Sequence, residues 1–285
     1  MSEETLQYNG WRPIRPHKPD FGAAADAPVE PTRFFDQMCY IGDHSVCCYL
    51  LETSEGCVLV DAMWPNEHST NLLKDGIKEL GHELSDVRAI VLTHCHEDHY
   101  GSSDWFRQQF GTTIYLSDID NTYGKDPDQI PGMPPLAPLP WDADVLLQDG
   151  DVLTFGDTKI RCVLTPGHTP GCMSFIIDVT DSGEPHKVML WGGTGIMPWT
   201  DPDEYIASAH KFEAICEDEG VDAYVSNHPF VDLSYLKLEI CRQIVDGVDN
   251  PFVVTPKDVH TYMEMFCEKA ENAKVLRAAD PNGML

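Results

Sequence analysis

Within six residues, the sequence places three histidines and one aspartate: His94, His96, Asp98 and His99. Imidazole nitrogens and carboxylate oxygens are ligands that suit zinc, at roughly 2.0–2.2 Å from the ion. The apolar run directly before them, at 87–93, is typical of a strand. Four such side chains converge at a strand end only where a metal ion or an unusual proton network offsets the crowding. The spacing predicts a metal-binding loop at a sheet edge, and a solvated histidine-rich turn is the alternative.

Two further histidines stand in segments that favour metal binding. His168 lies in the turn at 165–171, where two Pro-Gly elements fix the backbone and direct the imidazole. His228 follows an apolar run and precedes a proline, although histidines are common at strand ends without a metal. Both become candidate ligands because the first motif already predicts a metal. The other histidines lack such a context and are interpreted as structural: His17, His44, His68, His82, His186, His210 and His260.

With these motifs, the sequence from about 33 to 229 resembles the metallo-β-lactamase superfamily. The strand ending in Asp61 is similar to the family's early strand, the run 94–99 to its defining motif, and the turn 165–171 to its second metal loop. The resemblance implies an α/β fold, a four-layer αββα sandwich with the metals at one edge of two sheets. It also implies two zinc ions, the first held by His94, His96 and His168 and the second by Asp98, His99 and His228.

One position departs from the family pattern. Most hydrolases of the superfamily place a bridging aspartate after the second motif, and one lactamase subclass has cysteine there, but this chain has Gly193. The absence is similar to the lactamase subclass whose two zinc ions are held by histidines and one aspartate alone, where a serine usually occupies the position. Glycine here implies either a more weakly bound second zinc or a wider mouth for the substrate.

The resemblance implies hydrolysis. Two zinc ions about 3.5–4 Å apart share a hydroxide, because the pKa of bound water falls from about 15.7 to near 7. We expect this bridging hydroxide to attack a small carbonyl substrate and cleave a C–N or C–O bond, as in a β-lactam-like cyclic amide or a lactone. Asp98 is the catalytic candidate, because its carboxylate would orient the nucleophile. Asp61 either accepts a hydrogen bond from a ligand imidazole or caps a strand.

Large side chains near the motifs are candidate walls of the substrate pocket. They are Trp64, Tyr100, Trp141 and Trp199, together with the open position at Gly193. Aromatic side chains are as common in cores as in pockets, so core packing is the alternative for each. Cys95, between two ligands, is expected to point away from the metals as a structural thiol.

These motifs need strands and helices to position them. Period-two runs broken by turn residues predict strands at 35–41, 46–52, 57–61, 87–93, 113–116, 152–155, 159–164, 173–178, 187–190 and 223–226. Helical spacing of apolar residues predicts helices at 68–80, around 105–110, and at 202–219, 233–245 and 256–273. The proline-rich stretch 120–144 is expected to form a long loop. Strands followed by helices, twice over, indicate two packed sheets with helices outside.

The composition predicts one catalytic domain at 33–285 after an N-terminal extension at 1–32. The first 20 residues hold no apolar run, so we expect no secretory signal, no membrane anchor and a cytoplasmic location. The ten cysteines are scattered through apolar runs and are expected to be reduced. A net charge of −28 repels phosphates and anionic lipids, so a small-molecule substrate is expected and neither nucleic acid nor a membrane.

Two other functions stay open. Thioester hydrolysis is disfavoured by the missing aspartate and by the scarcity of basic residues to hold a glutathione-like anion. A non-catalytic, metal-dependent ligand sensor is compatible with glycine at the bridging position. The oligomeric state is either monomer or homodimer, and the segment 258–276 either packs on the core, which we favour, or forms a dimer contact.

Overall fold

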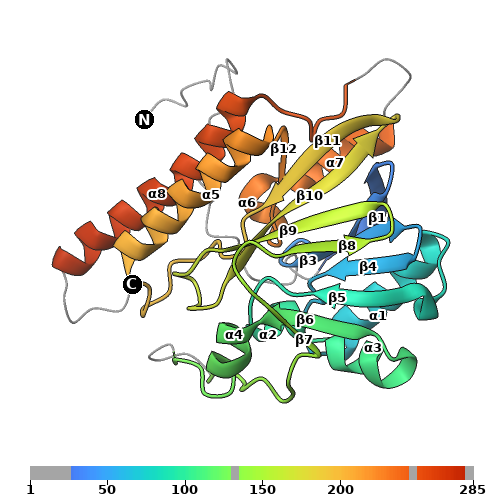
Figure 1. Ribbon diagram of the computed structural model, residues 1–285, viewed down its shortest axis with the longest axis horizontal. Helices are drawn as coiled ribbons and strands as arrows, with labels where there is room; N and C mark the ends of the chain where they lie inside the picture. The colour runs from blue at the N-terminus through green and yellow to red at the C-terminus, as the bar shows by residue number, and fades with distance from the viewer. Residues whose placement is uncertain (1–26, 130–134, 244–248, 280–285) are drawn as a thin grey trace.

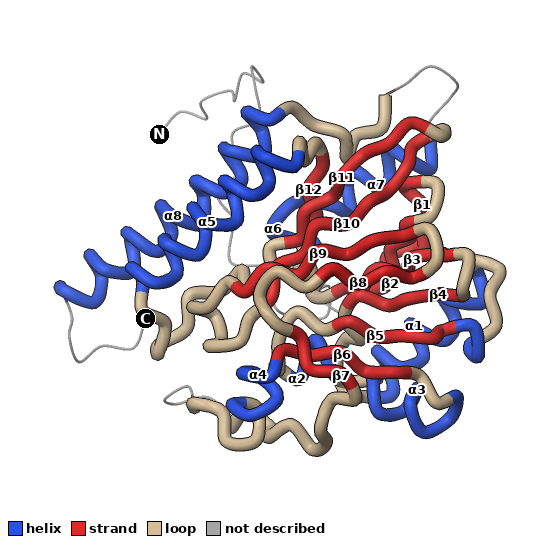
Figure 2. The backbone as a smooth tube through the Cα atoms, in the orientation of Figure 1, coloured by secondary structure: helices blue, strands red, loops and turns tan. Residues whose placement is uncertain are grey.

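The computed structural model describes residues 27–129, 135–243 and 249–279, which form two β-sheets with helices on both outer faces (Figure 1, Figure 2). The first sheet has seven strands in the order β1-β2-β3-β4-β5-β6-β7. Strands β1 to β4 pair antiparallel, and β4 to β7 pair parallel. Its bounds are β1 Pro28–Phe35, β2 Met38–Asp43, β3 Cys47–Thr53, β4 Gly56–Val60, β5 Val87–Val91, β6 Thr113–Ser117 and β7 Val145–Leu147.

The second sheet has five strands in the order β12-β11-β10-β9-β8. Its strands pair antiparallel, except that β11 and β12 run parallel. The bounds are β8 Val152–Phe155, β9 Thr158–Leu164, β10 Met173–Asp181, β11 Glu184–Leu190 and β12 Ala223–Val225.

Capping residues mark the start of α1 and the end of α5. The Asn66 side chain accepts a hydrogen bond from the Ser69 backbone N–H at the start of α1, and Gly220 ends α5 at a φ of 71°. The bounds are α1 Glu67–Glu79, the 3-10 helix η1 Leu84–Asp86, α2 Glu97–Tyr100, α3 Ser103–Phe110, α4 Asp118–Tyr123, α5 Pro202–Glu219, α6 Pro229–Asp232, α7 Ser234–Gln243 and α8 Pro256–Ala279.

Alternating side chains build the layers, because successive residues of a strand face opposite sides of its sheet. In β4, Val58 and Val60 face the core between the sheets, while Leu59 faces the outer core. In β10, Phe175 faces the core between the sheets, and Ile176 faces the other outer core. Burying each such side chain contributes roughly 1.5–3 kcal/mol.

Two groups of helices close the sandwich. Leu73 and Ile77 of α1 pack on the outer face of the first sheet. Phe212 of α5 and Phe266 of α8 pack on the outer face of the second sheet, and Figure 1 shows these two helices side by side. The arrangement is the αββα sandwich that the resemblance implied. The segment 258–276, which lies in α8, packs on the core through one face, as favoured from the sequence.

Most predicted elements are present, but two expectations are wrong. The predicted strand 35–41 spans a turn, because β1 and β2 form a hairpin there. The expected loop 120–144 begins inside helix α4, and its residues 130–134 lie outside the described residues. Strand β1 also begins at Pro28, within the expected extension 1–32, whose residues 1–26, with His17, are not described.

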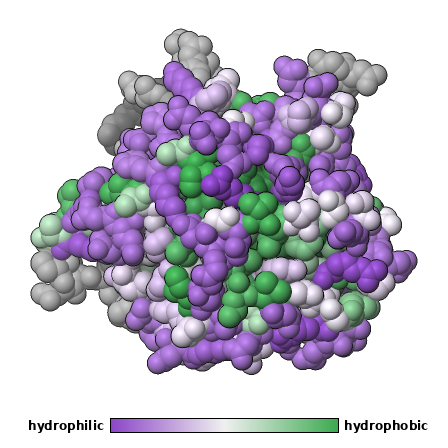
Figure 3. Space-filling view, viewed as in Figure 1, coloured by the Kyte–Doolittle hydropathy of each residue, from purple (hydrophilic) through white to green (hydrophobic). Residues whose placement is uncertain are grey.

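The surface and the cysteines agree with the composition. All ten cysteines are free thiols, and nine of them are buried. In the view of Figure 3, hydrophilic residues cover most of the periphery, and apolar ones show mainly in the middle. No helix within the described ranges combines the length and the apolar character that a membrane span requires.

Candidate metal centre

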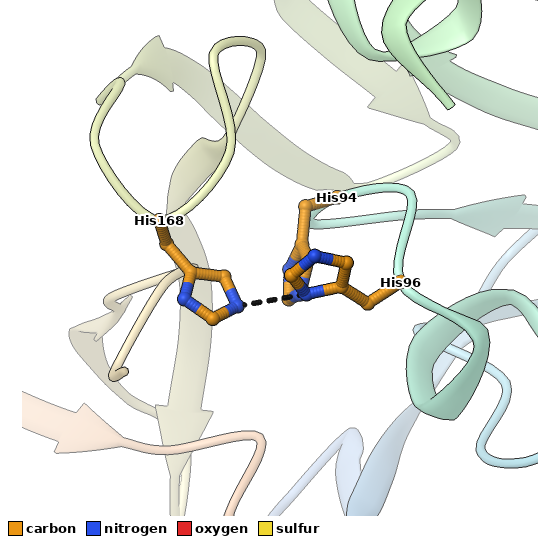
Figure 4. Close-up of side chains that lie close together, drawn as sticks. All are labelled: His94, His96 and His168. Atoms are coloured by element: carbon orange, nitrogen blue, oxygen red, sulfur yellow. Dashed lines mark hydrogen bonds between the residues drawn. The ribbon is translucent and has the colours of Figure 1, made fainter. Parts of the chain in front are cut away.

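Three imidazoles from two loops converge at one edge of the sheets (Figure 4). His94 and His96 follow β5, and His168 lies between β9 and β10. His96 Nδ1 lies 3.0 Å from His168 Nε2, and one nitrogen from each of the three rings lies within 4.8 Å of the others. All three side chains are buried. The structure therefore brings together the residues that the resemblance assigned to the first zinc.

The three rings offer lone pairs toward one another. His168 Nδ1 donates to the Gly195 carbonyl at 2.8 Å, which leaves its Nε2 as an acceptor. Burial lowers the pKa of His94 and His168 well below the usual value and that of His96 to about 4, so the rings are neutral. His94 Nε2 is buried without a hydrogen-bond partner. Neutral imidazoles with an orphaned nitrogen aimed at a shared point fit a zinc ion.

A second group lies beside the first. Asp98 and His99 belong to α2, and His228 caps the start of α6 after β12. Asp98 Oδ2 lies 3.4 Å from His99 Nε2 and 3.8 Å from His228 Nε2. His228 Nδ1 donates to the Ser45 carbonyl at 2.8 Å, which directs its other nitrogen toward Asp98. These are the three residues assigned to the second zinc.

Charge in this second group favours a cation. Burial alone would lower the pKa of His99, but the carboxylates of Asp98 and Asp61 raise it to about 10. Burial would raise the pKa of Asp98, but His99 and His228 hold it well below the usual range. Carboxylates that favour a proton on His99 would also favour a metal cation between its Nε2 and Asp98. The donor set fits zinc, which displaces that proton on binding.

Asp61 holds the imidazole of His99. Its Oδ2 accepts from His99 Nδ1 at 2.9 Å, and its Oδ1 accepts from the Thr93 backbone N–H at 2.8 Å. Of the two roles left open for Asp61, the hydrogen bond to a ligand imidazole is the one observed. Asn227 Nδ2 joins this network, 3.3 Å from Asp61 Oδ2 and 3.1 Å from the Gly192 carbonyl. The network fixes the ring orientation of His99.

Asp120, which the sequence reasoning missed, ties the two metal loops together. This fully buried carboxylate of α4 accepts from the backbone N–H groups of Cys95 at 3.0 Å and Gly171 at 2.7 Å, and from the Thr169 hydroxyl at 2.7 Å. It therefore spans the loop of His94 and His96 and the loop of His168. The sequence did not point to Asp120, because it is the first residue of the stretch 120–144, which was interpreted as a loop.

A close backbone approach positions the segment after Asp61. A Cβ at Gly101 would lie 2.1 Å from the carbonyl carbon of Trp64, so only glycine allows the contact. The Gly101 N–H donates to the Met63 carbonyl at 2.7 Å, and the Ala62 N–H donates to the His99 carbonyl. The glycine that follows the metal motif thus holds Trp64 beside the second group of ligands.

Steric crowding explains why position 193 is a glycine. A Cβ built on it would lie 2.3 Å from His168 Cβ and 3.0 Å from Cys172 Sγ. Its carbonyl accepts from the Tyr205 hydroxyl at 2.6 Å. The space beside Gly193 is filled by a predicted ligand, so the missing side chain does not widen the mouth of the site.

The proposed pocket walls fall into two classes. Trp64 lines a cavity with Asp98, and Trp199 lies 6.2 Å from the His96 ring and donates to the His168 carbonyl. In contrast, Tyr100 and Trp141 are buried in the core, 5.6 Å apart. Cys95 is buried in the same outer core, in agreement with a structural thiol.

A cavity of about 530 Å³ opens beside the second group and is lined by Asp98 and His228. Trp64, Val46 and Phe230 supply apolar lining, and Asp43, Ser45, Asn66, His68 and Ser69 supply polar lining. His68 was interpreted as structural, but it reaches this cavity from the first turn of α1, with Nε2 3.7 Å from Asp43 Oδ2. No local motif marked it, because its neighbours in the cavity come from other elements.

Comparisons with known proteins agree with this geometry. The model of the metallo-β-lactamase superfamily matches residues 41–181. The chain is 31% identical to the uncharacterized protein YobT of Bacillus subtilis (strain 168), over 60% of this chain and 75% of that protein. It is 30% identical to the probable polyketide biosynthesis zinc-dependent hydrolase PksB of the same organism, over 45% of this chain and 49% of that protein. The match thus spans about half the length of PksB.

Among solved structures, BJP-1, a subclass B3 metallo-β-lactamase of Bradyrhizobium japonicum, superposes with a TM-score of 0.77. Its identity to this chain is 28%, covering 90% of this chain and 98% of BJP-1. Sequence, fold and the placement of the candidate ligand side chains thus lead to one assignment. The chain belongs to the metallo-β-lactamase superfamily and is a metallo-hydrolase.

Proposed function

We propose that this chain hydrolyses a small carbonyl compound without a negative charge near the scissile bond, a lactone or an uncharged cyclic amide, using two zinc ions. The cavity beside Asp98 and His228 is the observation that carries the proposal. Its lining, as far as the chain is described, contains two carboxylates and no lysine or arginine. Its volume lies within the roughly 300–1,000 Å³ of small-molecule sites.

The two ligand groups divide the work. Zinc ions at these positions supply Lewis acidity toward a carbonyl and lower the pKa of bound water to near 7. His94, His96 and His168 hold one position, and Asp98, His99 and His228 hold the other.

Asp98 is suited to directing water. Its Oδ2 faces His99 and His228, so its second oxygen is left to accept a hydrogen bond from an attacking water. The carboxylate stays ionised at neutral pH, because the neighbouring imidazoles outweigh the effect of burial on its pKa. Asp98 is therefore the acceptor that orients the nucleophile.

The charge of the cavity selects among substrates. The Asp43 side chain is 2% exposed, and its Oδ1 accepts from the backbone N–H groups of Ser45 and Val46. β-Lactam antibiotics carry a carboxylate beside the ring, and binding sites usually hold such a group with arginine or lysine. The described lining offers that carboxylate no arginine or lysine and places the carboxylate of Asp43 in the same cavity. The same lining accepts a neutral lactone.

Apolar lining gives the substrate a second feature. Val46, Trp64 and Phe230 border the cavity. Each buried methylene contributes about 0.8 kcal/mol, so an acyl chain or ring would add affinity there. We therefore expect an acylated lactone to be a better substrate than an unsubstituted one.

Hydrolysis assays on the zinc-loaded protein test the proposal. The panel is an acyl lactone, a chromogenic β-lactam, a thioester and a phosphodiester, each with wild-type protein and the His168→Ala variant. The expected result is the highest kcat/KM for the lactone, abolished in the variant. A β-lactam or thioester turned over faster than the lactone would contradict the assignment, as would equal rates in the two proteins.

A further inference from the structure

A second cluster of metal-binding side chain types lies on the helical layer, away from the sheet edge. Helices α5 and α8 run antiparallel, since Lys274 near the end of α8 pairs with Asp203 near the start of α5. On the face they share, His210 and Glu213 of α5 meet His260, Glu264 and Cys267 of α8. None of these residues belongs to the site described above.

Three of them are arranged as a chelate. One ligand atom from each of His210, Glu264 and Cys267 lies within 4.8 Å of the other two. Glu264 and Cys267 are three residues apart on α8 and so lie on one face. His210 faces them from α5, with Nε2 3.9 Å from Glu264 Oε1. All three line one cavity of about 450 Å³, together with Glu268 and Glu271.

We propose that His210, Glu264 and Cys267 form a third metal site, which binds zinc and joins α5 to α8. Thiolate, imidazole and carboxylate are the three protein ligand types of zinc, and three protein ligands leave the fourth tetrahedral position to water. The thiolate also excludes calcium and magnesium, which prefer oxygen ligands.

The charges around the cluster attract a cation. Glu268 and Glu271 line the same cavity, and the chain carries a net charge of −28. Burial and the nearby carboxylates raise the pKa of the Cys267 thiol to about 11, so the thiol is protonated when no metal is bound. Metal binding therefore releases one proton from Cys267 to solvent.

The neighbouring group Glu213, His260 and Glu264 is also close enough to hold an ion. It is the weaker candidate, because His260 already pairs with Glu213 and the group contains no thiol. Both groups share Glu264. The His210 group is therefore the proposed site.

An ion bound at the third site would affect the proposed dizinc site at the sheet edge through α8. The Lys269 ammonium of α8 donates to the Thr194 carbonyl, and the Arg277 guanidinium donates to the carbonyls of Met197 and Thr200. These carbonyls belong to the segment that holds His168 through Gly195. Fixing α8 on α5 would stabilise that segment, and binding to the native state alone raises the unfolding free energy.

Cobalt substitution in the full-length chain tests the site without an activity assay. Cobalt(II) bound by a thiolate shows a sulfur-to-metal charge-transfer band in the near ultraviolet. The predicted ligands of the dizinc site include no sulfur, so the band reports Cys267 alone. We expect it in the cobalt-loaded wild type and in the control Cys241→Ser, and its loss in Cys267→Ser. Absence of the band in the wild type, or its persistence in Cys267→Ser, would overturn the proposal.

Metal counting gives a second measurement on an exposed residue. His210 is exposed, so His210→Ala leaves the core intact. After dialysis against zinc, this variant should bind one equivalent fewer than the wild type and than the control His82→Ala. The difference does not depend on how the first site is filled, so it is separable from the proposed function. Equal zinc content in His210→Ala and wild type would contradict a third site.

Discussion

The two ligand groups at the sheet edge are built differently. The group of His94, His96 and His168 consists of neutral, buried rings. The group of Asp98, His99 and His228 is charged, and two of its members are only half-buried and line the cavity. The first group is suited to holding a metal firmly. The second is suited to meeting the substrate.

The supports of the two groups differ as well. Asp120 ties together both loops of the first group. The second group depends on Asp61, on Asn227 and on the contact of His228 with the Ser45 carbonyl. Substitutions of these supports should therefore weaken zinc binding at the two positions to different extents, and the Thr93 hydroxyl, which contacts both Asp61 and His94 Nδ1, links the two supports.

The largest effect is expected for His168→Ala, which removes a ligand of the first group. Loss of a residue that only hydrogen-bonds to a metal ligand already weakens metal binding roughly 10–100-fold. Loss of the ligand itself should therefore lower kcat/KM by more than about 100-fold. The measurement is lactone hydrolysis with zinc analysis. His82→Ala, which removes a pair with Glu52, is the matched control. Full activity in His168→Ala would show that the first group does not hold a catalytic zinc ion.

Asp120→Asn should act on the first group without touching a ligand. The new amide replaces one carboxylate oxygen with an NH2 donor, which faces either the Gly171 N–H or the Cys95 N–H and the Thr169 hydroxyl, all of which now donate to the carboxylate. We expect zinc affinity at the first position to fall roughly 10–100-fold. Competition with a chelator measures it, and Asp118→Asn in the same helix is the control. Unchanged affinity would mean that the loops hold their geometry without Asp120.

Asp61→Asn should act on the second group. Asparagine tolerates the φ of 64° at this position and keeps one acceptor for His99. Zinc affinity at the second position should therefore fall only about tenfold, near the lower limit for losing a hydrogen-bond partner of a metal ligand. Binding of the second equivalent of zinc should weaken more than binding of the first. Calorimetric titration of the metal-free protein resolves the two. Equal weakening of both positions would show that they are coupled.

His68→Ala should have the smallest effect. The side chain is 44% exposed, and its interaction with Asp43 is worth about 0–1 kcal/mol. The KM for the lactone should therefore change less than about fivefold, with kcat unchanged. Steady-state kinetics decides this. A large fall in kcat would place His68 among the catalytic residues instead of the cavity lining.

Short-range patterns made the ligands predictable. His94, His96, Asp98 and His99 are neighbours in the sequence, and His168 stands in a turn with two Pro-Gly elements. The two-sheet sandwich followed from period-two runs and helical spacing, and the predicted helix 202–219 has the bounds of α5. These features depend on local chemistry that one segment contains by itself.

Long-range contacts and the edge strand β1 were not predictable. Asp120 and Asn227 act only because folding brings distant loops to them. Strand β1 contains Pro28 and Pro31, which lower strand propensity, but it lies at the sheet edge, where proline is tolerated. Tyr100 and Trp141 could not be assigned by type, because an aromatic ring suits a core and a pocket equally.

Anomalous diffraction at the zinc absorption edge, from crystals of the zinc-loaded protein, would locate both proposed zinc ions and their ligands. We expect one peak roughly 2.0–2.1 Å from His94 Nε2, His96 Nδ1 and His168 Nε2, and a second at the nitrogens of His99 and His228 and the carboxylate of Asp98. Two peaks with these ligands would support the dizinc site. No peak at this edge of the sheets, or a single peak with other ligands, would contradict the dizinc site.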